Sequence, residues 1–132
     1  MRRLAVAIAV TALAAAASAS SPAATPSYRQ CLKRASTTVA MEDCIKTERA
    51  RLARLTKLAI ARVAARSELG QKRLAQFASS QRAWRRFEKL DCDFSGSLVA
   101  GGTLEPVVAG ECLADRERQR LAELQTYTHF PD

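Results

Sequence analysis

The chain has 132 residues, 48% of them hydrophobic, and a formal net charge of +8, which is enough for one domain with a modest core. Its composition excludes a structural zinc site, because the only histidine, His129, lies beside the C-terminus and no C-x-x-C motif is present. A catalytic set is also missing, since no serine lies in an elbow motif and no two acids form a recognisable pair. We therefore expect neither an enzyme nor a bound cofactor or metal ion.

The N-terminal residues have the three parts of a secretory signal peptide. Met1-Arg2-Arg3 is positively charged, an apolar run extends from Leu4 to Ala17, and Ala17-Ser18-Ala19 fits a cleavage site. The run is too short for a transmembrane helix, so we expect no membrane-spanning segment in the mature chain. We expect export to the periplasm or the extracellular space, with a signal peptide at residues 1–19, a disordered linker at residues 20–26 and one domain at residues 27–130.

A short helix is expected over PSYRQCLKRA, residues 26–35, and a long helix follows it. From Thr38 to Glu68 there is no glycine or proline, Thr38 is a plausible N-cap, and Gly70 is a natural C-terminal stop. Apolar residues recur in this segment at steps of three, four or seven, which predicts a helix with one buried face. That face consists of Met41, Ile45, Leu52, Leu55, Ala59 and Val63.

A second long helix is expected from about Gln71 to Leu90, and the short break before it predicts an antiparallel hairpin. Its apolar face would consist of Leu74, Phe77, Trp84 and Phe87. Basic side chains lie on the other side of the same helix, namely Arg82, Arg85, Arg86 and Lys89.

The single tryptophan, Trp84, lies among arginines in SSQRAWRRFEKLDCDF. It could be a platform for stacking nucleic-acid bases or a residue of the core. Because Trp84 has the helical phase of Phe87 and the arginines do not, we favour a core residue that faces the first long helix. Gln81 lies one turn earlier on that face, where we favour a buried amide, bonded to the backbone or to the indole N–H, over contact with a partner.

Beyond Cys92 the helical periodicity ends. Residues 93–112, DFSGSLVAGGTLEPVVAGEC, hold four of the five glycines and a proline, which predicts a long loop between Cys92 and Cys112. A helical pattern returns in CLADRERQRLAELQTY, with Leu113, Leu121 and Leu124 as inward candidates. The predicted fold class is therefore all-α: a long antiparallel helical hairpin with a third, C-terminal helix and a short N-terminal helix.

Four cysteines remain after the signal peptide, and an even count in an exported chain indicates two disulfides. Local pairing would join Cys31 to Cys44 and Cys92 to Cys112, each closing a loop of about 13 to 20 residues and contributing roughly 3 kcal/mol. The hairpin would also bring Cys44 and Cys92 to the same end of the molecule, so a bond between those two is the alternative. We favour the local pairing.

Taken in order, these elements resemble the LprI-like, lysozyme-inhibitor-type N-terminal domain of small exported bacterial proteins, over roughly Cys31 to Leu124. Members of that family show Q-x-x-W followed by an aromatic residue and a cysteine, a Gly-Gly loop ending in cysteine, and R-x-x-x-L. These motifs fall here on Gln81, Trp84, Phe87, Cys92, Gly101, Gly102, Cys112, Arg120 and Leu124. Glu88 departs from the family pattern, because members often have an arginine directly after the aromatic residue.

The resemblance implies an exported, non-enzymatic binding protein with a lysozyme-type muramidase as its target. The distribution of charge offers an alternative, because residues 46–89 carry a net charge of +10 that could bind anionic envelope components such as lipid headgroups or lipopolysaccharide. Export argues against a specific nucleic-acid partner. Binding to a polyanion should fall more steeply with salt than a fitted contact between two proteins.

Acidic residues gather at the other end of the sequence, where residues 90–132 carry a net charge of −5. Animal lysozymes are basic, so an acidic loop would be a suitable docking site, although acids in a loop are also typical of a merely solvated surface. A loop held by a disulfide would lose little entropy on binding. We expect the partner-binding residues to be Asp93, Gly101, Gly102, Glu105 and Glu111, with the glycines allowing close backbone approach.

Overall fold

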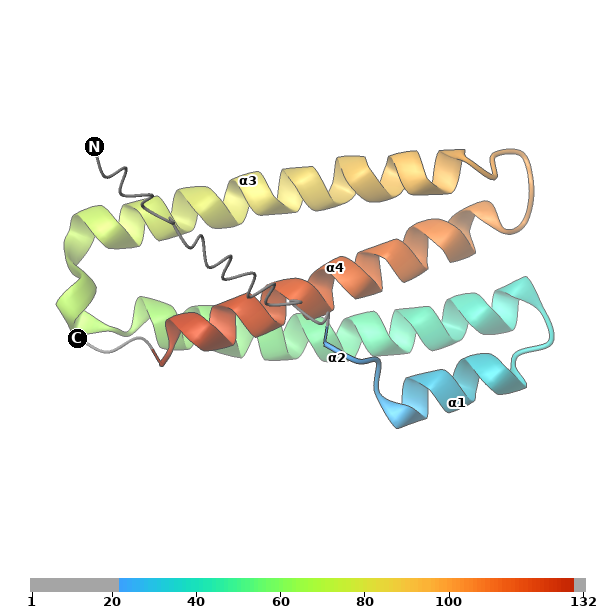
Figure 1. The fold of residues 1–132 in the computed structure, drawn as a ribbon, viewed down its shortest axis with the longest axis horizontal. Helices are drawn as coiled ribbons and strands as arrows, with labels where there is room; N and C mark the ends of the chain where they lie inside the picture. The colour runs from blue at the N-terminus through green and yellow to red at the C-terminus, as the bar shows by residue number, and fades with distance from the viewer. Residues whose placement is uncertain (1–21, 130–132) are drawn as a thin grey trace, which may run out of the picture.

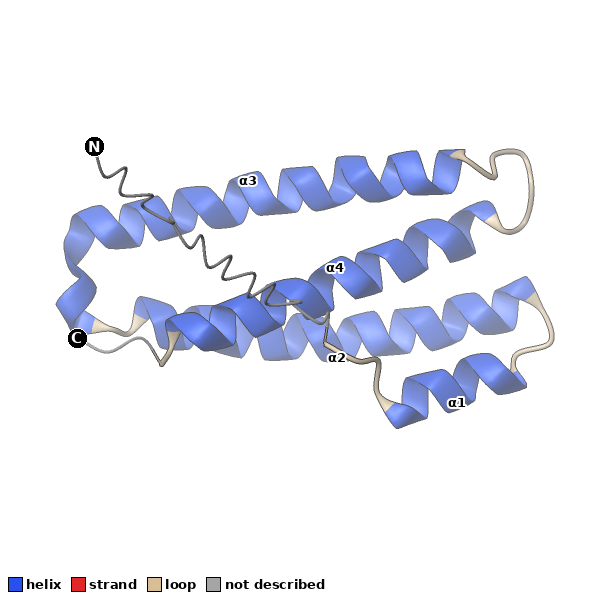
Figure 2. Cartoon of the chain, viewed as in Figure 1, coloured by secondary structure: helices blue, strands red, loops and turns tan. Residues whose placement is uncertain are grey.

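Four α-helices and one short 3-10 helix make up the protein in a computed structural model, which describes residues 22–129 (Figure 1). The elements are α1 (Pro26–Arg34), α2 (Thr38–Ala64), η1 (Ser67–Leu69), α3 (Gly70–Ser97) and α4 (Glu105–Tyr127). No strand occurs in this part of the chain (Figure 2), so the all-α prediction is confirmed. The signal peptide expected at residues 1–19 lies outside the described residues.

Threonine caps and one glycine set the ends of the first helices. Thr25 and Thr37 each accept a hydrogen bond from a backbone N–H three residues later, at 3.2 and 3.1 Å, and so begin α1 and α2. The observed cap of α2 is therefore one residue before the predicted Thr38. Gly70 has a φ of +66°, a left-handed conformation that favours glycine, and it reverses the chain between α2 and α3.

The C-terminal helix α4 lies between the two arms of the hairpin (Figure 1). It packs against both α2 and α3, runs in the same direction as α2 and is antiparallel to α3 (Figure 1). The short α1 packs on α2. None of the helices between residues 22 and 129 combines the length with the apolar character that a bilayer-spanning segment requires.

Small residues let α4 approach both neighbours closely. A Cβ atom on Gly110 of α4 would lie 2.9 Å from Cγ2 of Ile45, and a Cβ on Gly96 of α3 would lie 3.0 Å from Cβ of Ala109. Leu52 of α2 and Leu124 of α4 are fully buried. The core is therefore built along α4. The sequence pattern predicted a loop at the residues that form the first turns of this helix.

Both disulfides follow the local pairing. Cys31 is bonded to Cys44 and Cys92 to Cys112, with Cα–Cα distances of 5.8 and 5.4 Å. The first bond joins α1 to α2 and the second joins α3 to α4. The alternative bond between Cys44 and Cys92 is therefore excluded.

Two residues predicted to be buried are exposed instead. Leu55 of α2 is 37% exposed and Phe87 of α3 is 50% exposed, whereas Ile45, Ala59 and Val63 are buried as predicted. The periodicity placed Leu55 and Phe87 on the correct side of their helices. They lie at the margins of the buried face, because one narrow helix, α4, covers only part of each arm.

Candidate functional site

The segment expected to be a long loop over residues 93–111 is mostly helical. α3 continues to Ser97 and α4 begins at Glu105, so only residues 98–104 connect them. The loop prediction was wrong because the disulfide and the close packing of Gly96 and Gly110 stabilise helix that glycine by itself disfavours. We call residues 98–104, together with the adjoining helix ends, the tip.

Two of the three predicted partner-binding acids, Asp93 and Glu105, lie close together at the tip. Asp93 and Glu105 line a shallow cavity of about 390 Å³ with Gly96, Pro106 and Ala109. Asp93 forms an exposed ion pair with Lys89 of its own helix at 2.5 Å. Oε2 of Glu105 accepts a hydrogen bond from the backbone N–H of Gly101 at 3.4 Å. The tip therefore presents two carboxylates from neighbouring helix ends beside one exposed loop.

The other predicted residues have different surroundings. Glu111 lies outside the tip cavity, and it is close enough to Tyr28 of α1 that its charge adds to burial, the larger effect, in raising the tyrosine pKa to about 12. Gly101 has a φ of +85°, and no other group lies within 4 Å of the position of its missing Cβ. Gly101 is thus required by the turn, while Gly102 is exposed beside it.

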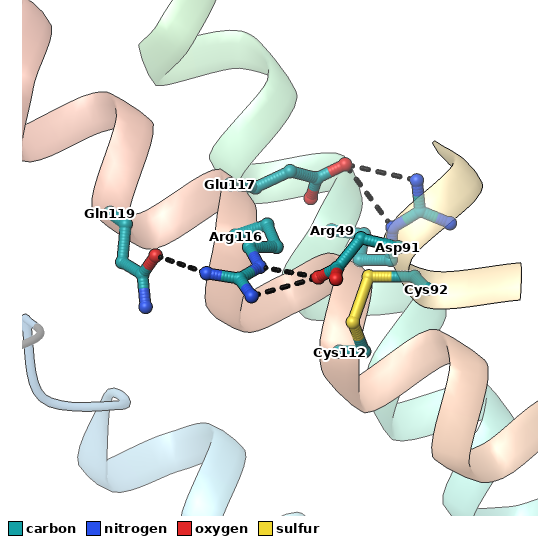
Figure 3. Close-up of a disulfide and its surroundings, with 7 residues drawn as sticks. All are labelled: Arg49, Asp91, Cys92, Cys112, Arg116, Glu117 and Gln119. Atoms are coloured by element: carbon teal, nitrogen blue, oxygen red, sulfur yellow. Dashed lines mark hydrogen bonds and ion pairs between the residues drawn. A yellow bond between two sulfur atoms is a disulfide. The ribbon is translucent and has the colours of Figure 1, made fainter. Parts of the chain in front are cut away.

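Charged side chains flank the disulfide that supports the tip. Figure 3 shows Arg116 of α4 between Asp91 and Gln119, near the Cys92–Cys112 bond. Its Nε donates to Asp91 at 2.9 Å, its Nη1 donates to Gln119 at 3.1 Å, and its guanidinium lies 5.4 Å from the centre of the Phe87 ring. The contacts of Arg116 with Asp91 and Phe87 bind α4 to α3 near the disulfide.

A second charge cluster, with a buried glutamate and a buried arginine at its centre, joins α1, α2 and α4. Glu48 of α2 and Arg118 of α4 are both buried, and Nη1 of Arg118 lies 3.4 Å from Oε1 of Glu48. Arg51 donates two hydrogen bonds of 2.8 Å to Glu48, and these bonds hold the pKa of the Glu48 carboxyl below its usual range. The guanidinium of Arg118 lies 5.5 Å from the ring centre of Tyr28 in α1. None of these four residues was among the predicted site residues.

The residues of the Q-x-x-W motif pack against α4. Arg120 donates from Nε to Oε1 of Gln81 at 2.8 Å, and its guanidinium lies 5.8 Å from the Trp84 ring. Gln81 therefore bonds to an arginine side chain, whereas the sequence suggested the backbone or the indole. Trp84 is half-buried, contacts Arg120 of α4 and also borders a groove that α2 residues line. These contacts link α3 to α4.

A groove between α2 and α3 holds the most perturbed carboxyl group. It has a volume of about 560 Å³ and is lined by Ala53, Thr56, Lys57, Ile60, Trp84, Arg85, Glu88 and Glu117. Burial, followed by the nearby charge of Glu117, raises the pKa of Glu88 to about 7. One buried oxygen of each glutamate has no hydrogen-bond partner among the described residues. Glu117 is fixed in place by Arg49, which donates to its other oxygen at 2.9 Å.

These features define a small helical domain that is cross-linked by two disulfides and presents an acidic tip. The sequence model of the family described as "Lysozyme inhibitor LprI" matches residues 29–124, which include α2, α3 and most of α4. The chain belongs to this family.

One curated relative extends the comparison. A stretch of 52 residues is 36% identical to an uncharacterized protein of Rhizobium meliloti (strain 1021), and it covers 39% of this chain and 37% of that protein. The match thus spans little more than a third of the relative's length. No solved structure matches the chain.

Proposed function

We propose that this protein is an exported, non-enzymatic inhibitor that binds a lysozyme-type muramidase. Membership of the lysozyme inhibitor LprI family is the observation that carries this proposal. The two disulfides support export, because such bonds form and persist in oxidising compartments. The expected signal peptide agrees with the same location.

The charge of the tip supports it as the docking face. Residues 90–115 contain five acids and no lysine or arginine, so this part of an otherwise basic chain attracts a cationic protein. Asp93 and Glu105 both line the tip cavity, where they can pair with basic groups of the target. The Cys92–Cys112 bond holds the two helix ends together, so the tip loses little freedom when it binds.

An inhibition assay with the mature, oxidised protein tests the proposal. Muramidase activity of several lysozyme types should fall on addition of the protein at micromolar concentration, and the complex should be recovered on a size-exclusion column. If no lysozyme is inhibited or bound, the inhibitor function is refuted. Binding to anionic lipid vesicles that disappears with salt would then favour the envelope-binding alternative.

A matched set of variants locates the docking face. Glu105→Gln should weaken inhibition by about fivefold, with a slower association rate, because one exposed ion pair contributes up to about 1 kcal/mol. Glu68→Gln removes an equal charge in η1, near the α2–α3 turn at the other end of the bundle, and should leave inhibition unchanged (Figure 1). Equal loss in both variants would show that the tip is not the contact surface.

A further inference from the structure

An apolar stripe lies exposed along the C-terminal half of α3. Phe87, Leu90, Phe94 and Leu98 are 50%, 59%, 64% and 70% exposed. Their spacing of three or four residues places them on one side of the helix, with Phe87 at its margin next to Arg116 of α4. In Figure 2, α3 forms one edge of the bundle. Four large apolar side chains in one row indicate a surface that is covered by a partner.

The same face of α3 continues toward the N-terminus with small residues. Ser79, Ser80 and Ala83 are exposed and share the helical phase of the stripe. The two serine hydroxyls are already bonded within the helix: Ser80 donates to the carbonyl of Phe77 at 2.8 Å, and Ser79 accepts from Arg82 at 2.9 Å. Each hydroxyl oxygen would therefore keep one hydrogen-bond partner when this face is covered.

This face of α3 therefore has small side chains in its N-terminal half and large apolar side chains in its C-terminal half. Two copies of such a face complement each other when they pack antiparallel. If two copies of α3 pack antiparallel with their centres near residue 88, Phe94 lies over Ala83 of the second copy and Phe87 lies beside Leu90 of the second copy. Leu98 then reaches Ser79 of the second copy. Phe94 and Leu98 thus each meet a small residue of the second copy, and Phe87 meets a leucine. This arrangement allows the two helices to pack closely.

Charge complementarity selects a second copy as the partner. Arg86 and Asp93 are exposed and seven residues apart, so both lie on the same flank of the stripe. In the antiparallel pair, Arg86 of each copy faces Asp93 of the other, and the symmetry repeats this contact. Asp93 can leave Lys89 and pair with Arg86 of the second copy, because both side chains of the present Lys89–Asp93 ion pair are exposed to solvent.

We propose that the protein forms an antiparallel homodimer through the face of α3 that extends from Ser79 to Leu98. The interface is isologous, so each side chain contributes twice. This inference is independent of the proposed inhibitor function. Because Asp93 also lines the tip cavity, the dimer and a docked target compete for the same carboxylate.

Sedimentation equilibrium of the mature, oxidised protein between about 1 and 100 µM tests the dimer. The unmodified protein should dimerise in this range, and Leu90→Glu should raise the dissociation constant by roughly 100-fold, because it adds two charges to an apolar contact. Leu58→Glu is the matched control, since Leu58 is 57% exposed on α2 and lies outside the interface. Unchanged circular dichroism would show that each variant remains folded.

A charge exchange tests the orientation of the two copies. Arg86→Asp and Asp93→Arg should each weaken the dimer about tenfold, whereas the double variant should restore it, because each new pair is again of opposite charge. A protein that stays monomeric at 100 µM overturns the proposal. So does a dimer that is unaffected by Leu90→Glu, or a double variant that is weaker than either single one. A monomer that binds phosphatidylglycerol vesicles through the same leucine would identify the stripe as a membrane contact instead.

Discussion

The carboxyl group of Glu88 should make the stability of the protein depend on pH. In the folded state its pKa is raised to about 7, whereas an unperturbed glutamate has a pKa of 4.5. Between these two pH values the folded protein holds a proton that the unfolded chain has lost. The free energy of unfolding must therefore decrease as the pH rises through this window.

The size of this effect follows from the shift. The difference between the folded and unfolded pKa of Glu88 corresponds to a change of at most about 3 kcal/mol in the free energy of unfolding. Glu88 borders a groove that is open to solvent, so screening should reduce the effect to about 1–2 kcal/mol. Charged groups near Glu88 come from α2, α3 and α4. Arg49 of α2 and Arg85 of α3 lower the pKa of Glu88, and Glu117 of α4 raises it. Lys57 of α2 also lines the groove.

The variant Glu88→Gln removes the titrating group and keeps its shape. At pH 8 the variant should be more stable than the unmodified protein by about 1–2 kcal/mol, or about 4–8 °C in Tm, and at pH 4.5 the difference should disappear. Urea unfolding followed by circular dichroism at a series of pH values measures both. Asp43→Asn, on the exposed surface of α2, is the control. A difference that does not change with pH, or a variant that is less stable at pH 8, would refute this reasoning.

Three further changes test the packing of α4. Trp84→Ala should lower the free energy of unfolding by about 2–3 kcal/mol in urea titrations, less than for a fully buried tryptophan, because the ring is half-buried; a loss below 1 kcal/mol would contradict the contact with α4. Gly110→Val should destabilise the fold by more than about 2 kcal/mol in thermal unfolding, since even a Cβ would lie 2.9 Å from Ile45, and an unaffected Tm would show that the helices can separate freely. Glu48→Gln should cost about 3–5 kcal/mol because it leaves the buried Arg118 without its α2 partner, and a stable variant would mean that Asp115 alone neutralises this arginine.

Local patterns in the sequence were sufficient to identify the two long helices of the hairpin and to favour the observed cross-links, but not to predict the helical structure of residues 93–97 and 105–111. Apolar spacing identified α2 and α3, and cysteine spacing favoured the two disulfides that the structure contains. These predictions succeed because helical phase and loop closure depend on residues that are close in the chain. The acidic character of the tip can likewise be counted directly from the sequence.

The tertiary structure decided which neighbour covers each helical face. A periodic stripe shows that a face is apolar, but the spacing of Phe87 is the same whether the side chain is buried or exposed at 50%. Only the position of α4 between α2 and α3 explains why Trp84 contacts Arg120 and why residues 105–111 are helical in spite of their glycine. The sequence by itself determined the all-α class, the two long helices and the distribution of charge, and it favoured the pairing of the cysteines that the structure contains. The burial of Glu48, the shifted pKa of Glu88 and the exposed stripe on α3 arise from contacts between residues far apart in the chain, which no local pattern encodes.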